Sequence, residues 1–219
     1  VNILPKQEVE KIYKEIQVAL FRLIPEKWEK LYLYASVLGG RGEMFFYYFP
    51  KKTILKPKPI NCYEVAQKFG INEEQYSIEL SKLYEKIRRL NELAINKWTN
   101  VTISIENCLF SIEYNFEDIL HSVYTDEQRH VYWEYKYLKT PIESLSKSNQ
   151  NFIRYYSKEP MPKTYLYTEG IYINNKLDMK KENVSIFEQN EEYQKPTYKF
   201  IGIVFNTYII LEIDKEMYI

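Results

Sequence analysis

Histidine and cysteine side chains can carry out acid–base, nucleophilic or metal chemistry, and the chain has two of each. His121 and His130 lie in an acidic stretch, where Asp118, Asp126 or Glu127 could join them in a metal site. Their spacing matches no ligand pattern, and acids near a helix N-terminus have a structural reason to be there, because they stabilise the helix dipole. We therefore predict that the chain binds no metal and no cofactor.

The two cysteines, Cys62 and Cys108, are candidate nucleophiles, but neither has an assignable base nearby in the sequence. The chain also contains no nucleophile elbow, P-loop, dinucleotide-binding glycine pattern or HExxH pair. The run GGRG at 39–42 indicates a hairpin turn, since a phosphate-binding loop leads into a helix. We expect no enzymatic activity. The alternative is a small cytosolic enzyme that uses Cys108 or the acidic cluster of His121 and His130.

Acidic residues are concentrated between 101 and 135. This stretch has seven acids and one base, Arg129, hence a local net charge of −6, although the whole chain balances 30 basic against 30 acidic residues. Charges segregated in this way steer a basic partner onto one surface; the alternative is an ordinary solvated face. The acids predicted to contact a partner are Glu113, Glu117, Asp118, Asp126 and Glu127.

Tyrosine is unusually frequent, with 22 residues. It is enriched at protein interfaces because it combines a large rigid ring with one polar group. Codon bias in an AT-rich genome would also produce this count, so tyrosine frequency supports binding only weakly. Tyr32 and Tyr34 are the tyrosines that we predict as partner contacts. The expectation is a protein that acts by holding another protein.

The bulk composition is that of a folded globular protein of 219 residues, with 45% hydrophobic and 27% charged residues. Its neutral charge balance gives no general attraction to nucleic acids or anionic membranes. Two cysteines provide no disulfide framework, no stretch approaches the roughly 20 apolar residues of a transmembrane helix, and the charged first residues do not resemble a signal peptide. These features indicate a cytoplasmic protein.

Hydrophobic periodicity predicts the elements that must position these residues. Helical spacing of apolar residues predicts helices at 6–24, 73–95 and 125–138, with a shorter one at 63–69 that ends at Gly70. Alternation predicts paired strands at 28–37 with 43–49, and at 101–106 with 109–116. The order of these elements predicts an α+β fold: an antiparallel sheet built from hairpins, with helices packed on one face.

The C-terminal part has a different character. The segment 144–151 is polar and is either a linker or the start of another helix, whereas 51–59 indicates a loop. Strand-like sequences follow at 164–173, 198–205 and 208–214, the last two forming a hairpin across Asn206-Thr207. We predict a first domain at 1–140 and a β-rich C-terminal extension of unknown role at 141–219.

Four blocks of this sequence resemble the YezG and EsaG family of small bacterial proteins. They are IPEKWEKLYLYASV (24–37), GEMFFYYF (42–49), WTNVTISIENCLFSIEYNFED (98–118) and YWEYKYL (132–138). The resemblance covers about residues 6–140 in the same order. The PEKWEKLYLYA and YWEYKYL blocks are its most specific parts. This chain continues for about eighty residues after the last block, whereas typical members end soon after it.

The resemblance implies an immunity protein, or antitoxin, in the cytoplasm of a Gram-positive bacterium. Its partner would be the nuclease domain of a toxin exported by type VII secretion, and it would bind neither nucleic acid nor membrane. The family supplies no catalytic residue. A nuclease presents a basic cleft to its substrate, so an acidic surface with aromatic anchors could cover that cleft. A chaperone or adaptor for secretion is another interpretation.

Overall fold

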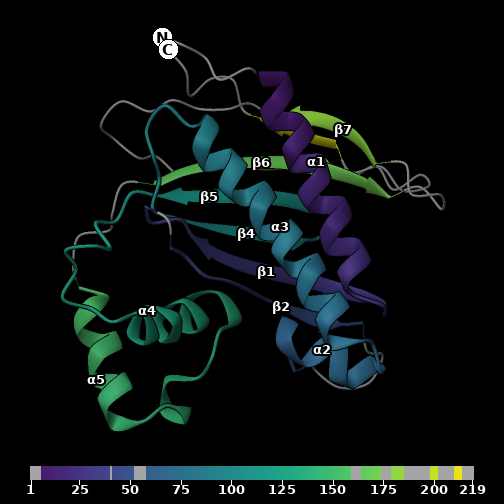
Figure 1. The fold of residues 1–219 in the computed structure, drawn as a ribbon. Coiled ribbons are helices and arrows are strands. Elements are labelled where there is room, and N and C mark those ends of the chain that lie inside the picture. The colour runs from purple at the N-terminus through teal and green to yellow at the C-terminus, as the bar shows by residue number, and fades with distance from the viewer. Residues whose placement is uncertain are drawn as a thin grey trace, which may run out of the picture.

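The centre of the fold is one antiparallel sheet (Figure 1). The computed structural model describes residues 6–39, 41–51, 58–158, 164–173, 179–184, 198–201 and 210–213. In these residues the sheet has seven strands in the order β3-β2-β1-β4-β5-β6-β7. The strands are β1 (Trp28–Ser36), β2 (Met44–Pro50), β3 (Ile60–Asn61), β4 (Asn100–Glu106), β5 (Leu109–Asn115), β6 (Thr164–Ile173) and β7 (Met179–Val184).

One face of the sheet carries the main apolar core. Leu33 of β1 pairs with Ile103 of β4, which pairs with Ile112 of β5, and all three side chains are fully buried. The helices α1 (Lys6–Leu23) and α3 (Glu73–Leu93) cross this face (Figure 1). The shorter α2 (Cys62–Phe69) packs next to β2, with Asn61 as its N-cap and Gly70 in the left-handed conformation as its C-cap. The predicted α+β fold is confirmed.

The opposite face of the sheet is covered in part by the segment after β5. This segment forms α4 (Asp126–Trp133), a π-helical turn η1 (Glu134–Leu138), a short 3-10 turn η2 (Ile142–Ser144) and α5 (Lys147–Tyr156). The predicted arrangement of helices on one face describes α1 and α3, and α4 with η1 adds a second, smaller layer. The predicted helix at 125–138 is therefore a short α-helix followed by a π-turn, and the polar segment at 144–151 begins a helix.

The turn from β1 to β2 needs glycine. Gly39 has a φ of 48°, in the left-handed region. A Cβ atom on Gly42 would lie only 2.1 Å from the carbonyl oxygen of Ser36 and from the Tyr84 hydroxyl, so no other residue fits without a shift. The run at 39–42 thus joins two strands, as predicted, and leads into no helix.

The sheet continues into the C-terminal part of the chain. β6 pairs with β5, with Thr168 opposite Ser111, and β7 pairs with β6. β8 (Tyr198–Ile201) and β9 (Ile210–Ile213) pair with each other in a separate sheet. The predicted turn at Asn206-Thr207 and most of the predicted loop at 51–59 lie outside the described residues. The division into domains 1–140 and 141–219 stays a prediction. Among the described residues, no helix is long and apolar enough to cross a membrane.

Candidate partner-binding site around helix α4

The start of α4 is fixed by a reciprocal cap. The Thr125 hydroxyl accepts a hydrogen bond from the Gln128 backbone N–H at 3.2 Å, and the Gln128 side chain accepts one from the Thr125 N–H at 3.0 Å. This capping box satisfies two N–H groups that the helix itself leaves unpaired. It also places Asp126 and Glu127 in the first turn, exposed to solvent, where the helix dipole favours negative charge.

Trp133 anchors α4 to the sheet. Its side chain is only 5% exposed, and its Nε1 donates a hydrogen bond of 3.0 Å to the Thr102 hydroxyl on β4. Its ring packs edge-on against Phe45 of β2, with 5.2 Å between centroids. One turn earlier, the His130 ring stacks on the same Phe45 at 4.0 Å. Helix α4 therefore packs on aromatic residues of β1 and β2, chiefly Tyr34 and Phe45, which we call the seat of α4.

The π-helical turn η1 adds a polar contact to β5. The Lys136 ammonium lies 3.1 Å from a Glu113 carboxylate oxygen, and the Tyr137 hydroxyl donates to the other oxygen at 3.0 Å. Glu113 therefore has two partners within the protein. A reversal of its charge would disturb the packing of η1 as well as any contact with a partner.

His130 also has internal partners. Its Nε2 lies 3.3 Å from the Glu134 carboxylate, which accepts a hydrogen bond of 2.6 Å from the Tyr47 hydroxyl. Burial alone would raise the pKa of Glu134, but the hydrogen bonds from His130 and Tyr47 outweigh it and lower that pKa. His121 contacts another acid, Asp118, at 2.9 Å. The two histidines thus contact different carboxylates, Glu134 for His130 and Asp118 for His121.

The two cysteines lie in different environments. Cys62 is fully buried at the start of α2, and burial raises the pKa of its thiol to about 11, so the thiolate nucleophile is scarce at neutral pH. Cys108 is exposed in the turn between β4 and β5, at a φ of 62°. Within the part of the chain that the structure describes, no group of three or more histidine, cysteine or acidic residues could hold a metal ion.

The two tyrosines predicted as contacts differ in exposure. Tyr34 is 7% exposed, because Phe45 stacks on its ring at 5.2 Å and Trp133 covers it. Tyr34 thus packs against α4, and it also lines the cavity beside α4 that is described below. Tyr32 is half-buried, and its hydroxyl donates a hydrogen bond of 2.7 Å to Glu106.

The predicted acidic contacts separate into two groups. Asp118, Asp126 and Glu127 are exposed. Glu113 and Glu117 are half-buried and have internal partners, the partner of Glu117 being the Tyr156 hydroxyl at 3.3 Å. The first group can meet another protein without any change in the fold. As contacts, all seven predicted residues stay untested.

The charge concentration at 101–135 is weaker in space than in sequence. Lys30 of β1 lies 2.8 Å from Glu106, and Lys136 lies 3.1 Å from Glu113, yet both lysines are outside this stretch. Arg129, the single base within it, pairs with Asp126 at 2.5 Å. The net charge of the sequence stretch 101–135 leaves out Lys30 of β1 and Lys136 of η1, which pair with two of its acids in the folded protein. The negative charge that faces solvent is carried by the exposed acids.

Sequence reasoning missed two exposed apolar side chains between β5 and α4. Leu120 is 59% exposed and Val123 is 87% exposed. Their segment, DILHSVY at 118–124, follows neither helical nor strand periodicity. This lack of periodicity is the sequence feature that could have indicated apolar side chains outside the core. Single exposed apolar residues are common on protein surfaces. These two are of interest because they lie in the same short segment as the exposed acids. We name the set of Asp118, Leu120, Val123, Asp126 and Glu127 the 118–127 surface.

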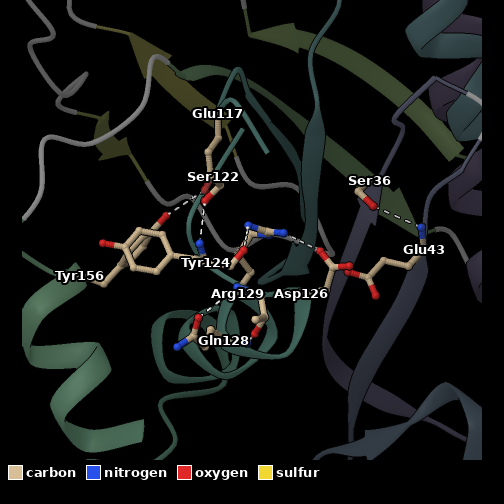
Figure 2. A network of polar contacts seen from close by, with 10 residues as sticks. Ser36, Glu43, Glu117, Ser122, Tyr124, Asp126, Gln128, Arg129 and Tyr156 are labelled. Carbon is tan, nitrogen blue, oxygen red and sulfur yellow. Dashed lines mark hydrogen bonds and ion pairs between the residues drawn. The ribbon is translucent and has the colours of Figure 1, made fainter. Parts of the chain in front are cut away.

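Behind the 118–127 surface lies a polar network (Figure 2). The Arg129 guanidinium donates to the Tyr124 carbonyl at 2.7 Å and to Asp126 at 2.5 Å. The Arg129 side chain is only 10% exposed. Figure 2 shows the Glu43 carboxylate facing that of Asp126. Burial, followed by the charge of Asp126, raises the pKa of Glu43.

This geometry gives a prediction for Glu43→Gln. A carboxyl group whose pKa is higher in the folded state than in the unfolded state destabilises the fold when it is ionised. For Glu43 this destabilisation is present at neutral pH and disappears as pH falls through the folded pKa toward the usual 4.5. Glu43→Gln is therefore expected to raise the free energy of unfolding at pH 7, and to raise it less at pH 5. Urea unfolding at both pH values measures this, with the exposed Glu29→Gln on β1 as the control. A less stable Glu43→Gln protein at pH 7 would contradict the assignment.

A cavity of about 480 Å³ lies between α4, α5 and the ends of β4 and β5. Its walls combine aromatic residues, among them Tyr124, Tyr132, Trp133 and Tyr156, with polar and charged ones. Arg129 also lines it, and its mouth adjoins the 118–127 surface, because Asp118 and Val123 belong to both.

Comparison with known proteins gives consistent matches. The family model described as "YezG-like: Immunity protein YezG-like" matches residues 9–154. Two relatives with the name "Immunity protein YezG" are similar: one from Bacillus spizizenii is 32% identical over 58% of this chain and 80% of its own length, and one from Bacillus subtilis is 30% identical over 58% and 85%. The "Type VII secretion system protein EsaG" from Staphylococcus aureus is 26% identical over 60% of this chain and 82% of its own length.

Proposed function

Because this chain belongs to the family of YezG-like immunity proteins, we propose that it binds a cognate toxin directly, neutralises it, and so protects the cell that produces it. The observation that carries this proposal is the extent of the family match. Residues 9–154 include nearly all of α1, the strands β1 to β5, the seat of α4 and most of α5. The same range contains the whole 118–127 surface.

The toxin, we propose further, is a nuclease. Nucleases bind a polyanion and so present a basic surface to it. The 118–127 surface offers the complement, since Asp118, Asp126 and Glu127 are exposed and negatively charged next to the apolar Leu120 and Val123. The acids would speed the encounter, and the apolar side chains would slow dissociation. An inhibitor seated on the basic cleft excludes the nucleic acid.

The proposed setting is the cytoplasm of a cell that exports its toxin by type VII secretion. The name of the Staphylococcus aureus relative, a type VII secretion system protein, supports that route. A toxin that acts on nucleic acid is dangerous to its producer before export, so the inhibitor is needed where the toxin is made. In this account the chain itself carries out no reaction, which agrees with the buried thiol of Cys62 and the separate partners of His121 and His130.

Controlled expression in a bacterial host tests the proposal. The gene for the candidate cognate toxin is induced with and without this protein, and growth and chromosomal integrity are followed. We expect that the toxin alone arrests growth and degrades DNA or RNA, and that co-expression of this protein prevents both effects. Toxicity that persists when the protein is present, folded and abundant would contradict an immunity role. Rescue from a toxin that leaves nucleic acids intact would retain immunity and exclude the nuclease.

A further inference from the structure

The cavity beside α4 is a pocket with aromatic walls at the edge of the proposed toxin-binding surface. Its volume of about 480 Å³ falls within the roughly 300–1,000 Å³ of ligand pockets and exceeds what one side chain needs. Tyr156 meets Tyr124 edge-on at 4.8 Å and Tyr132 edge-on at 4.6 Å, so the Tyr156 ring stands at a steep angle to both. On the other wall, Trp133 lies 5.3 Å from Tyr137. The π-face of an aromatic ring carries negative charge density and attracts a cation.

The cations in the wall already have partners. Arg129 donates to the Tyr124 carbonyl and to Asp126, and Lys136 is paired with Glu113. The Lys136 ammonium also lies 4.8 Å from the centre of the Tyr137 ring, which is within the range of a cation–π contact. This contact between Lys136 and Tyr137 shows that an aromatic ring of the cavity wall can hold a positive charge.

The charge balance of the cavity favours a cationic guest. Glu117 and Asp118 line it, and Glu113 and Asp126 hold the two wall cations, so four carboxylates stand against two cations. His121 contributes a positive charge only when it is protonated. A guest with one positive charge would therefore reduce a net negative charge, whereas an anionic guest would increase it.

We propose that this cavity receives an arginine or lysine side chain of the toxin, whose charged end lies against the tyrosine rings with Glu117 and Asp118 at the mouth. This inference rests on the proposed function and deepens it, because it names an anchoring contact. A basic cleft of the kind that binds nucleic acid supplies such side chains. Buried anchors at the centre of an interface carry much of its binding energy.

The first part of the test uses defined probes and the intact protein. N-acetyl-arginine amide is titrated while the Nε1–H resonance of Trp133 is followed by NMR, since this group lines the cavity and donates to Thr102. N-acetyl-citrulline amide, which has nearly the same shape without the charge, is the matched control, and N-acetyl-glutamate amide tests the anionic alternative. We expect a saturable shift with the arginine probe alone. No shift with that probe, an equal shift with citrulline, or a preference for glutamate would overturn the proposal.

The second part uses the domain of the cognate toxin that the wild-type protein neutralises. Ser122→Trp places a bulky ring in the cavity, and Tyr156→Leu removes one aromatic wall while keeping most of its volume. Ser148→Trp, at an exposed position of α5 that does not line the cavity, is the control. We expect the first two variants to weaken toxin binding at least about tenfold, as is typical of a lost anchor, and the control to leave it unchanged. Circular dichroism and melting temperature verify folding.

These outcomes separate the two claims. Both cavity variants, folded and binding the toxin as tightly as the wild type, would overturn the cavity proposal and leave the proposed function intact. A wild-type protein that does not bind the toxin would overturn the proposed function, and the arginine titration would still decide what the cavity accepts.

Discussion

Replacement of Trp133 by alanine is expected to lower the free energy of unfolding by about 3–5 kcal/mol, the usual effect of removing a large buried aromatic side chain. The side chain is 5% exposed, packs against Phe45 and Tyr34, and provides the hydrogen bond to the buried Thr102 hydroxyl. Its loss would leave a cavity and would remove one hydrogen bond to the Thr102 hydroxyl. Because α4 is seated through this residue, the variant should also bind the toxin less tightly.

Two further variants sharpen this expectation. Trp133→Phe keeps most of the packing and loses the Nε1 donor, so its destabilisation should be smaller, about 1–3 kcal/mol. Tyr155→Ala removes an aromatic side chain that is 68% exposed, and its effect should stay within about 0.5 kcal/mol. Chemical denaturation measures all three. A Trp133→Ala protein that loses less than about 1 kcal/mol would show that α4 is held mainly by other contacts.

Reversal of the three exposed acids of the 118–127 surface is expected to slow association with the toxin by about 10- to 100-fold at low salt. The variant is Asp118→Lys, Asp126→Lys and Glu127→Lys, and Glu113 is left unchanged because it is held by Lys136 and Tyr137. The change adds six positive charges to a surface that would face a basic cleft. Screening should reduce the difference at high salt, where the Debye length is shorter.

A matched variant controls for the charge change itself. Glu73→Lys, Glu74→Lys and Glu79→Lys make the same change on α3. Two of these acids are in the first turn of a helix, as Asp126 and Glu127 are, so both variants carry a similar helix-dipole cost of about 0.3–1 kcal/mol per residue. Asp126→Lys also removes the partner of Arg129, so circular dichroism and melting temperature verify the folding of both variants. Stopped-flow kinetics at two salt concentrations measures association. Equal rates for the two variants would show that the 118–127 surface does not guide the encounter.

Local patterns were sufficient to predict most of the fold. The alternation of Leu31, Leu33 and Ala35 with Tyr32 and Tyr34 identified both the strand and its core-facing side. Helices at 6–24 and 73–95 followed from apolar spacing and match α1 and α3 within two residues. These elements bury one regular apolar stripe each, and such a stripe is visible in the sequence.

Elements determined by tertiary contacts were not visible in this way. The predicted helix at 125–138 gave no sign of its π-turn, whose Lys136 and Tyr137 are positioned by Glu113 on a distant strand. The pairing of β6 with β5 likewise depends on residues some fifty positions apart, such as Ser111 and Thr168, whose hydroxyls lie 3.0 Å apart. Single-sequence periodicity carries no information about such partners.

The candidate site was predicted in part for the same reason. The exposed acids at 118, 126 and 127 followed from charge density and a helix start, and their exposure agrees with a role at the surface. Tyr34 looked like an outward-facing tyrosine, because alternation shows which side of the sheet a residue occupies and not whether another element covers that side. The aromatic cavity was not predicted, since it forms only where α4, α5 and two strands meet.

The most direct test of the account is a titration of toxin activity with this protein. The purified toxin domain is assayed on nucleic acid with increasing amounts of the protein, and the affinity of the same pair is measured by calorimetry. We predict that inhibition becomes complete at a fixed molar ratio of the two chains, follows the measured affinity, and is shifted to higher concentration by the Asp118, Asp126 and Glu127 reversal. Full toxin activity at a saturating excess of the folded protein would contradict neutralisation by direct binding.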